Sequence, residues 1–494
     1  MPTTLTYRRR MLILAICCMS LLIVSLDNTV LNVALPALGK DFDAPVSGLQ
    51  WAIDAYTVVI ASLLMLAGST ADRLGRRRVF QTGLAVFTLA SVLCSLAPSL
   101  EWLIAFRALQ AVGGSMLNPV AMSIITNTFT EPRERARAIG VWGGVVGISM
   151  AAGPLVGGLL VETVGWRSIF WINLPVGLAA ILLTARYVPE SKAPHPRRPD
   201  PVGQLLVMAL LGSLTFAIIE ARGHGVTSPL IITCVGVALA ALVLLLWYEP
   251  RRAEPLIELR FFRSAPFSGA TLVAVSAFAA LAGFLFLGSL FLQDAKGLSP
   301  MEAGLWLLPM AAMTAVFAPL SGRLVGSRGP RLPLLLAGPL IAASALLFAA
   351  FDAELSTGRM LTAYVLFGMG FGLVNAPITN TAVSGMPRAQ AGVAAAVAST
   401  SRQVGTALGV AVLGAVLAHG WTGKGSPADF AAAASPAWWI ITGCGVAILL
   451  VGALTTGAWG RRSAARVAEQ LGSADSAATA TPPRRPSAEG PVRP

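Results

Sequence analysis

Three polar side chains stand in the first apolar segment of the chain, where a helix would cross a membrane. Asp27, Asn28 and Asn32 follow directly on the mainly apolar run from Met11 to Leu26. That run is shorter than the roughly 20 residues that span a bilayer, so Asp27 is expected inside the membrane. A carboxylate in hydrocarbon is costly unless it faces a cavity or a partner, so the pattern predicts an ion or substrate path. The alternative is that Asp27 lies at the helix end and meets water.

A base and a second acid are expected at a similar depth. Arg107 lies in the fourth apolar segment, roughly 9 Å from its outer end at about 1.5 Å per residue, and Asp54 begins the second segment from the same side. We hypothesise that Asp27 is the main proton acceptor and Arg107 its switchable partner, because burial favours a neutral carboxyl and a nearby guanidinium favours a charged one. Asp54 is a second candidate for the proton, with a helix cap at the membrane interface as the alternative. The Asp27 carboxylate would also favour a cationic substrate.

The composition places these residues in a membrane protein. Of the 494 residues, 55% are hydrophobic and 12% are charged, with a mean hydropathy of +0.72, whereas soluble domains carry about 25% charged residues. The five cysteines lie in apolar runs without zinc or disulfide spacing, so no metal site is expected. A net charge of +13 would suggest nucleic acid as a partner for a soluble protein. The distribution of the basic residues along this chain argues against that partner.

Hydropathy predicts an all-α polytopic membrane protein with fourteen transmembrane helices. The spans are predicted near residues 11–31, 51–71, 79–97, 101–125, 138–160, 167–188, 201–220, 229–248, 267–290, 302–325, 331–351, 360–382, 392–418 and 436–457. With the amino terminus inside the cell, most Lys and Arg residues of this map fall on the cytoplasmic side, as the positive-inside rule requires. The protein is therefore expected in the plasma (bacterial inner) membrane, with both termini cytoplasmic.

The two halves of the chain repeat one another. The glycine spacing of residues 68–75 recurs at 322–329, and that of 113–118 recurs at 370–375. This repetition predicts two six-helix lobes, a design on which alternating-access transporters are built. The predicted parts are an N-terminal lobe at 11–190, a cytoplasmic linker with two inserted helices at 191–266, a C-terminal lobe at 267–459 and a disordered cytoplasmic tail at 460–494.

Five motifs resemble those of one transporter family. The stretch Gly68 to Arg77 is similar to the signature between the second and third spans of the major facilitator superfamily. Leu103 to Gly114 resembles its fourth-span motif, and Gly153 to Gly158 resembles its fifth-span antiporter motif. Leu26 to Pro36 and Trp166 to Pro175 resemble signatures of the fourteen-span drug:proton antiporter branch. The resemblance extends over nearly the whole chain before the tail and implies drug export in exchange for protons.

The loop after the second span suits a gate. Its candidate gating residues are Asp72, Arg73, Gly75 and Arg76. Asp72 can hold Arg76 or a neighbouring helix N-terminus through charge and dipole, and such a latch could break during transport. The alternative is that the arginines only set the topology.

The fifth span carries the second group of gating candidates. Gly153, Pro154 and Gly157 form a face on which helix backbones can approach closely, and Pro154 allows a bend. That face suits a rocking interface between the lobes and equally suits plain tight packing.

Several residues inside the spans are candidates for the substrate cavity. They are Asn28, Asn118, Trp306, Met310, Asn375, Asn380 and Arg402. The asparagines could instead bond across helices. Flexible Met and flat aromatic side chains suit promiscuous binding, but they could equally face lipid or the core. Arg402 either pairs with an acid across the cavity or extends to the cytoplasm.

These features predict a proton-coupled efflux transporter that exports amphipathic or cationic drugs, dyes or antibiotics by alternating access. No Gly-x-x-x-x-Gly-Lys-Ser/Thr phosphate loop is present, so the proton gradient is the expected driving force, with no cofactor. No nucleophile–base constellation indicates an enzyme. The expected partners are a small-molecule substrate, protons and membrane lipids, and the protein is expected to be monomeric. The alternative is a dedicated exporter of a single neutral or acidic metabolite or antibiotic.

Overall fold

The described part of the chain is built from helices. The computed structural model describes residues 6–193, 200–252, 254–349, 356–383, 391–421 and 426–479. The first group of helices comprises α1 (Tyr7–Phe42), α2 (Val46–Leu74), α3 (Arg76–Ser95), α4 (Leu100–Thr128), α5 (Pro132–Thr163), α6 (Ser168–Trp171) and α7 (Asn173–Tyr187). Next come α8 (Pro201–His224), α9 (Pro229–Tyr248) and the short 3-10 helices η1 (Glu249–Arg251) and η2 (Leu259–Arg263). The second group comprises α10 (Ala265–Leu290) with its π-helical end η3 (Phe291–Ala295), α11 (Pro300–Arg328), α12 (Arg331–Ala349), α13 (Thr357–Val383), α14 (Ala391–Gly420) and α15 (Pro427–Thr455), and α16 (Ala458–Thr479) follows it.

Most of these helices can cross a membrane. Within the described residues, 13 helical segments are long and apolar enough to do so. The prediction of an all-helical, multi-pass membrane protein is therefore confirmed. The remaining predicted span falls in α5, of which the described residues include the apolar stretch Ala152–Thr163.

Local chemistry sets where the helices begin and end. In hydrocarbon a helix pairs its backbone N–H and C=O groups within itself, which is why each apolar segment is helical. Ser299 and Glu302 form a capping box at the start of α11, and Ser426 and Asp429 form one at the start of α15. α2 ends at Gly75, whose φ of 119° disfavours any residue with a Cβ. The chain therefore turns at positions that the sequence specifies.

The first part of the tail is helical, which corrects the expectation of a disordered tail. Alanine-rich sequence favours the helix α16, and contacts with η2 hold its first turns. The Ser463 hydroxyl donates to the backbone oxygen of Arg263 at 3.0 Å, and Val467 is buried in the same contact. Residues 480–494, and 194–199 of the predicted linker, lie outside the described residues.

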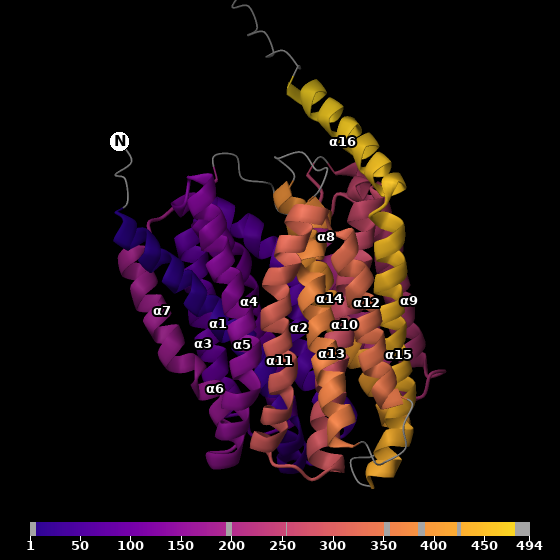
Figure 1. Ribbon diagram of the computed structural model, residues 1–494. Coiled ribbons are helices and arrows are strands. Elements are labelled where there is room, and N and C mark those ends of the chain that lie inside the picture. The colour runs from indigo at the N-terminus through magenta and orange to yellow at the C-terminus, as the bar shows by residue number, and fades with distance from the viewer. Residues whose placement is uncertain are drawn as a thin grey trace, which may run out of the picture.

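Two groups of helices stand side by side, with α1 to α7 in indigo to magenta and α10 to α15 in pink through orange to yellow (Figure 1). They meet along a seam, where α2 packs on α14 and α5 packs on α11. α8 contacts both α2 and α14. The inserted helix α8 therefore lies across the seam, and α9 packs on α8.

Among the described residues, the hydrogen bonds across the seam lie toward one end of the bundle. We call the end at which α1 begins the N-terminal end and the opposite one the far end. The hydrogen bonds across the seam at the far end are Gln50 Nε2 to Val410 O at 3.0 Å, Ser289 Oγ to Asn32 O at 2.5 Å, Gln293 Nε2 to Val33 O at 2.9 Å and Ser299 Oγ to Glu162 Oε2 at 2.8 Å. Backbone oxygens of α1 and α14 thus serve as acceptors for side chains of the other group.

α5 and α11 touch at the far end and separate toward the N-terminal end. A Cβ on Gly304 would overlap the carbonyl oxygen of Pro154. Gly322 lies on the same face of α11, about five helical turns later. A Cβ there would meet nothing within 4 Å, and the same holds for Gly140 on α5. This side of the seam is closed at the far end and open at the N-terminal end.

Replacing Gly304 by Ala should destabilise the protein, because the added methyl group would overlap the Pro154 carbonyl. Overpacking of this kind costs about 1–3 kcal/mol. Gly322→Ala is the matched control, since it adds the same atom to the same face in open space. The midpoint of thermal unfolding in detergent, followed by tryptophan fluorescence, should fall only for Gly304→Ala. Equal midpoints for the two variants would contradict the tight contact.

Candidate functional site

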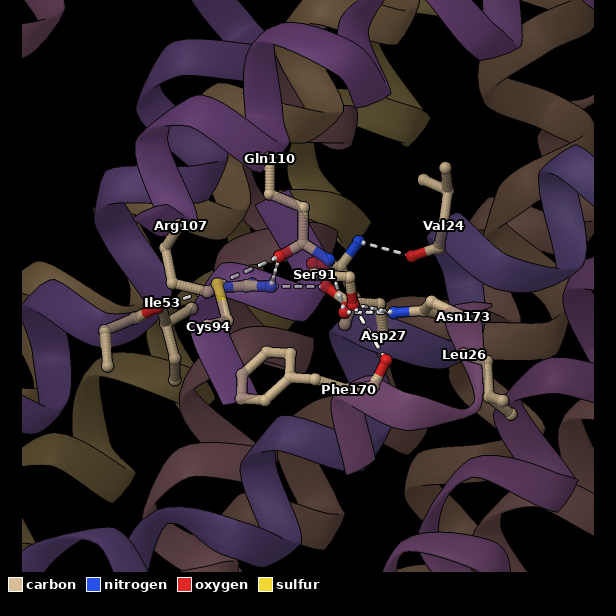
Figure 2. Close-up of polar contacts among 12 residues, drawn as sticks. Val24, Leu26, Asp27, Ile53, Ser91, Cys94, Arg107, Gln110, Phe170 and Asn173 are labelled. Carbon is tan, nitrogen blue, oxygen red and sulfur yellow. Dashed lines mark hydrogen bonds and ion pairs between the residues drawn. The ribbon is translucent and has the colours of Figure 1, made fainter. Parts of the chain in front are cut away.

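Asp27 lies inside α1 and is held by side chains of two other helices (Figure 2). One carboxylate oxygen forms an ion pair and hydrogen bond with Nη1 of Arg107 on α4. The other accepts hydrogen bonds from Gln110 Nε2 at 2.9 Å and from Asn173 Nδ2, on α7, at 3.0 Å. The Asp27 and Arg107 side chains are 2% and 1% exposed, so the pair is sealed from solvent.

Arg107 has partners besides Asp27. Its Nε donates to the backbone oxygen of Ala52 at 3.2 Å, and Nη1 also donates to Gln110 Oε1 at 2.6 Å. The guanidinium carbon lies 4.2 Å from the centre of the Tyr56 ring, which adds a cation–π contact. Nη2 has no hydrogen-bond partner among the described residues. α2 thus supplies an acceptor and an aromatic face that position the guanidinium.

Further hydrogen bonds orient the amides that hold Asp27. Asn173 Nδ2 also donates to Ser91 Oγ at 2.9 Å, and Ser91 donates to the backbone oxygen of Phe170 at 2.9 Å. The helix break between α6 and α7 places Asn173 at the first position of α7. Gln110 follows Arg107 by three residues, so both lie on one face of α4. Five helices, α1 to α4 and α7, therefore contribute to one polar cluster, which we call the Asp27 cluster.

Hydrogen bonding makes this buried charge tolerable and also limits what it can bind. Removing two charges from water is repaid only when the geometry is good and the remaining polar atoms are satisfied. Both oxygens of Asp27 have donors, and the carboxylate has a cationic partner. In this conformation the carboxylate is occupied and does not face a cationic substrate. Protonation of Asp27 would weaken its attraction for Arg107.

The structure separates Asp54 from the other two predicted proton-coupling residues. Asp54 is fully buried on α2, where one oxygen accepts from Thr57 Oγ1 at 3.1 Å. Its Oδ2 has no hydrogen-bond partner among the described residues. No hydrogen bond or ion pair joins it to Asp27 or Arg107 in the described part of the chain. Only Asp27 and Arg107, of the three, come together.

The sequence analysis assigned no role to Gln110, Asn173, Ser91 or Tyr56. Gln110 and Asn173 lie within motifs that it quoted, and both amides are buried, at 0% and 2% exposure. The spacing of three between Arg107 and Gln110 was a signal that the two side chains share a face. Ser91 and Tyr56 carry no comparable signal, because only tertiary packing brings them to the cluster.

The predicted gating residues after α2 form one connected turn. Arg76 Nη2 and Nε donate to Asp72 Oδ1 at 2.8 and 3.0 Å, and Arg73 is exposed. A Cβ on Gly75 would lie 2.6 Å from Glu190 Oε1. The Glu190 carboxylate accepts the backbone N–H of Arg77 at 3.1 Å, at the start of α3. The chain after α7 therefore lies against this turn.

In α5 the predicted gating residues face two different neighbours. A Cβ on Gly153 would overlap the Thr29 side chain, and one on Gly157 would lie 2.9 Å from Val30. Both glycines thus allow α5 to pack on α1, within the first group. Pro154 contacts Gly304 across the seam.

The cavity candidates have different surroundings. Asn28, half-buried, donates to the backbone of its own helix, and Asn118 has a buried Oδ1 without a hydrogen-bond partner among the described residues. Met310 is 2% exposed, and Trp306 is half-buried with its ring 6.3 Å from that of Tyr364.

Three candidates lie on the neighbouring helices α13 and α14. Asn375 is half-buried and Asn380 is exposed on α13. Arg402 is half-buried on α14 and donates to Thr379 Oγ1 of α13 at 2.5 Å. Thr379, which the sequence analysis did not single out, is therefore the residue that joins Arg402 to α13.

Fold and sequence comparisons define the class of protein. A crystal structure of a bacterial homologue of the human lysosomal transporter Spinster, in an inward-facing and occupied conformation, superposes with a TM-score of 0.63 at 17% sequence identity. The alignment covers 94% of this chain and 98% of that one. The family model of the Major Facilitator Superfamily matches residues 17–410. The protein has the fold of a membrane transporter.

Two curated relatives are considerably closer in sequence. The "Multidrug resistance protein Stp" of Mycobacterium tuberculosis is 38% identical over 411 residues, covering 83% of this chain and 76% of that protein. The "Tetracenomycin C resistance and export protein" of Streptomyces glaucescens is 36% identical over 398 residues, covering 80% and 74%. The chain belongs to the Major Facilitator Superfamily.

Arg107→Gln should destabilise the protein by about 3–5 kcal/mol, because it leaves the Asp27 carboxylate buried without a counter-charge. Adding Asp27→Asn to that variant should recover part of the loss. The free energy of unfolding is measured for the wild type, the two single variants and the double variant. These four values form a double-mutant cycle that isolates the interaction energy between Asp27 and Arg107. Additive losses, with no recovery in the double variant, would show that the two residues do not stabilise one another.

Proposed function

We propose that this protein exports amphipathic drug-like compounds, antibiotics among them, in exchange for protons. One observation carries the proposal: a buried carboxylate, Asp27, paired with a buried guanidinium, Arg107, in the middle of a transporter fold. Ionisable residues inside a membrane commonly mark proton or substrate pathways. Relatives named for multidrug resistance and for tetracenomycin C export support the substrate class.

The proposed topology has fourteen spans with both ends in the cytoplasm of a bacterial cell. α5 has 32 residues, more than the roughly 20 that a span needs, and completes the set of 13 apolar segments. Arginines at the N-terminal end, such as Arg8, Arg73 and Arg323, support a cytoplasmic position for that end under the positive-inside rule. The conformation described above is then open to the cytoplasm and closed to the outside.

Asp27 is the proposed proton carrier, and Arg107 is its switch. In the cytoplasm-open form the pair is intact, so the carboxylate is charged and the proton has left. Opening to the outside moves the helices that supply Arg107, Gln110 and Asn173 relative to α1. The carboxylate then takes a proton from the acidic side, and the cycle returns it to the cytoplasm. Asp54, buried and with one oxygen unpartnered among the described residues, is the proposed second proton site.

α5 and α11 are the proposed moving elements of the gate. Their far ends are in contact through Pro154 and Gly304, whereas Gly140 and Gly322 face open space. Small residues allow close helix approach, so the N-terminal ends can close when the far ends separate. The turn of Asp72, Arg73, Gly75 and Arg76 is proposed to latch the closed form.

Asp27→Asn should abolish proton-coupled export, because an amide cannot exchange a proton, and the comparison is made at equal amounts of folded protein. The measurement uses everted vesicles with an acidic lumen and a pH dye, to which cationic, neutral and anionic fluorescent drugs are added. Substrates should dissipate the gradient with the wild type and not with the variant. Asp43→Asn is the matched control, since Asp43 ends α1 outside the cluster in a left-handed conformation that Asn also adopts. Export by Asp27→Asn at the wild-type rate would refute the assignment.

Cysteines placed at Gly140 and Gly322, in a background without the native cysteines, should cross-link only when the protein visits the outward-open form. Cysteines at Glu162 and Ser299, whose side chains are hydrogen-bonded at 2.8 Å across the seam, are the matched pair at the closed end. This second pair should cross-link at rest. Gel mobility after mild oxidation, with and without a proton gradient, reports both. If the first pair never cross-links, the proposed rocking of α5 on α11 is wrong.

A further inference from the structure

Arg402 is a cation inside the second group of helices, and the described residues offer it little compensation. It lies about 17 Å along α14 from the N-terminal end of that helix, at about 1.5 Å per residue. Its Nη2 donates to the hydroxyl of Thr379 at 2.5 Å, and its guanidinium carbon lies 5.8 Å from the Phe278 ring centre. Its Nε is buried without a hydrogen-bond partner. A neutral hydroxyl and an aromatic face do not balance a full positive charge.

No carboxylate of the described residues forms an ion pair with Arg402. Acids of the second group are few, and their positions explain this. Asp294 in η3, Glu302 in the first turn of α11 and Asp429 in the first turn of α15 all lie at the far end of the bundle. Asp352 and Glu354 fall outside the described residues. Arg402 is therefore distant from the described acids of its own group.

Arg107 shows how this protein surrounds a buried arginine that has an acidic partner. That guanidinium has a carboxylate, an amide oxygen, a backbone oxygen and a tyrosine ring around it. Arg402 has one hydroxyl and one ring. Taking a charge out of water without a partner is expensive, and such residues in membranes usually serve a substrate. The missing partner of Arg402 is an anion.

Neighbouring residues make the region around Arg402 suitable for a polar ligand. Thr379 and Asn380 are exposed on α13, and Asn375 is half-buried one turn before Thr379. Asn380 follows Thr379 directly on α13 and carries an amide that can donate hydrogen bonds. The planar fork of an arginine matches the two oxygens of a carboxylate, which makes such pairs specific as well as strong.

The charged residues along the rest of the transport path also favour an anionic ligand. Asp27, which the sequence suggested as the site for a cationic substrate, is enclosed by its own partners. The open N-terminal end of the seam carries exposed arginines, including Arg137 on α5 and Arg323 on α11. A positive entrance attracts anions and repels cations from the cytoplasmic side.

We propose that Arg402, together with Thr379 and Asn380, binds an anionic oxygen group of the exported compound, a carboxylate or an ionised phenol. The proposal rests on the proposed export function and specifies its substrate class as acidic amphipathic compounds. Of the substrates expected from the sequence, the proposal favours acidic compounds over cationic ones. Arg402 is then the specificity-determining residue, and Asp27 remains the proton carrier.

Two dyes with one ring scaffold and opposite charge test the proposal. Fluorescein is an anionic phenylxanthene at mildly alkaline pH, and tetramethylrosamine is a cationic one. Binding of each dye to purified protein in detergent is measured by fluorescence anisotropy. The wild type should bind fluorescein more tightly than tetramethylrosamine. Arg402→Gln should weaken fluorescein binding by about tenfold or more, as expected for the loss of a charged hydrogen bond, and should leave tetramethylrosamine binding unchanged or stronger.

Two further variants separate the charge of Arg402 from other effects. Arg402→Lys keeps the charge and should retain most of the preference for fluorescein, which also shows that position 402 tolerates substitution. Arg466→Gln removes the same charge from an exposed position of α16 and should change neither affinity. Size-exclusion profiles and unfolding midpoints confirm that each variant is folded.

Equal binding of both dyes by the wild type, tighter binding of tetramethylrosamine, or binding of neither would overturn the proposal. An unchanged preference in folded Arg402→Gln would overturn it as well. Export is measured separately with the same dyes in everted vesicles. A wild type that binds fluorescein through Arg402 but never exports a dye under a proton gradient would refute the proposed function and leave the binding site intact.

Discussion

The ion pair between Asp27 and Arg107 is the contact on which the first group of helices depends. Neither charge is stable in the bundle alone, because each side chain is almost completely buried. The pair is tolerable because Gln110, Asn173 and the backbone of α2 complete its hydrogen bonds. Five helices must therefore keep their places for one carboxylate to stay charged, so the charge of Asp27 and the arrangement of these helices are linked.

Helices α1 and α2 connect the Asp27 cluster to the seam between the two groups. α1 carries Asp27 and, little more than one turn later, offers the backbone oxygen of Asn32 to Ser289 of the second group. α2 holds Arg107 through Ala52 and reaches α14 through Gln50. Asp27 thus lies little more than one helical turn from contacts that hold the far end closed. In the proposed mechanism, these contacts link the conformation of the seam to the charge state of Asp27.

How much the sequence could predict depended on the range of the interactions. Apolar length and charge bias were enough for a helical, multi-pass membrane protein, because spanning segments must satisfy their own backbone. Asp27 and Arg107 stood out because charges are rare in such segments. Ser91 and Tyr56 could not be found, since ordinary residues join the cluster only through packing. Asp54 was grouped with the pair by its depth, but depth does not specify the face of α2 on which it lies. The helix α16 was missed because polar composition was weighed above the helix propensity of alanine.

The most direct test of this account is the infrared spectrum of the Asp27 carboxyl group in the two forms of the seam. The protein with cysteines at Gly140 and Gly322 is measured free and cross-linked, at one pH, as a difference spectrum. The account predicts a protonated-carboxyl band that appears on cross-linking and disappears when Asp27→Asn is added. A band that survives Asp27→Asn, or a spectrum without a new carboxyl band, would contradict the claim that Asp27 carries the proton.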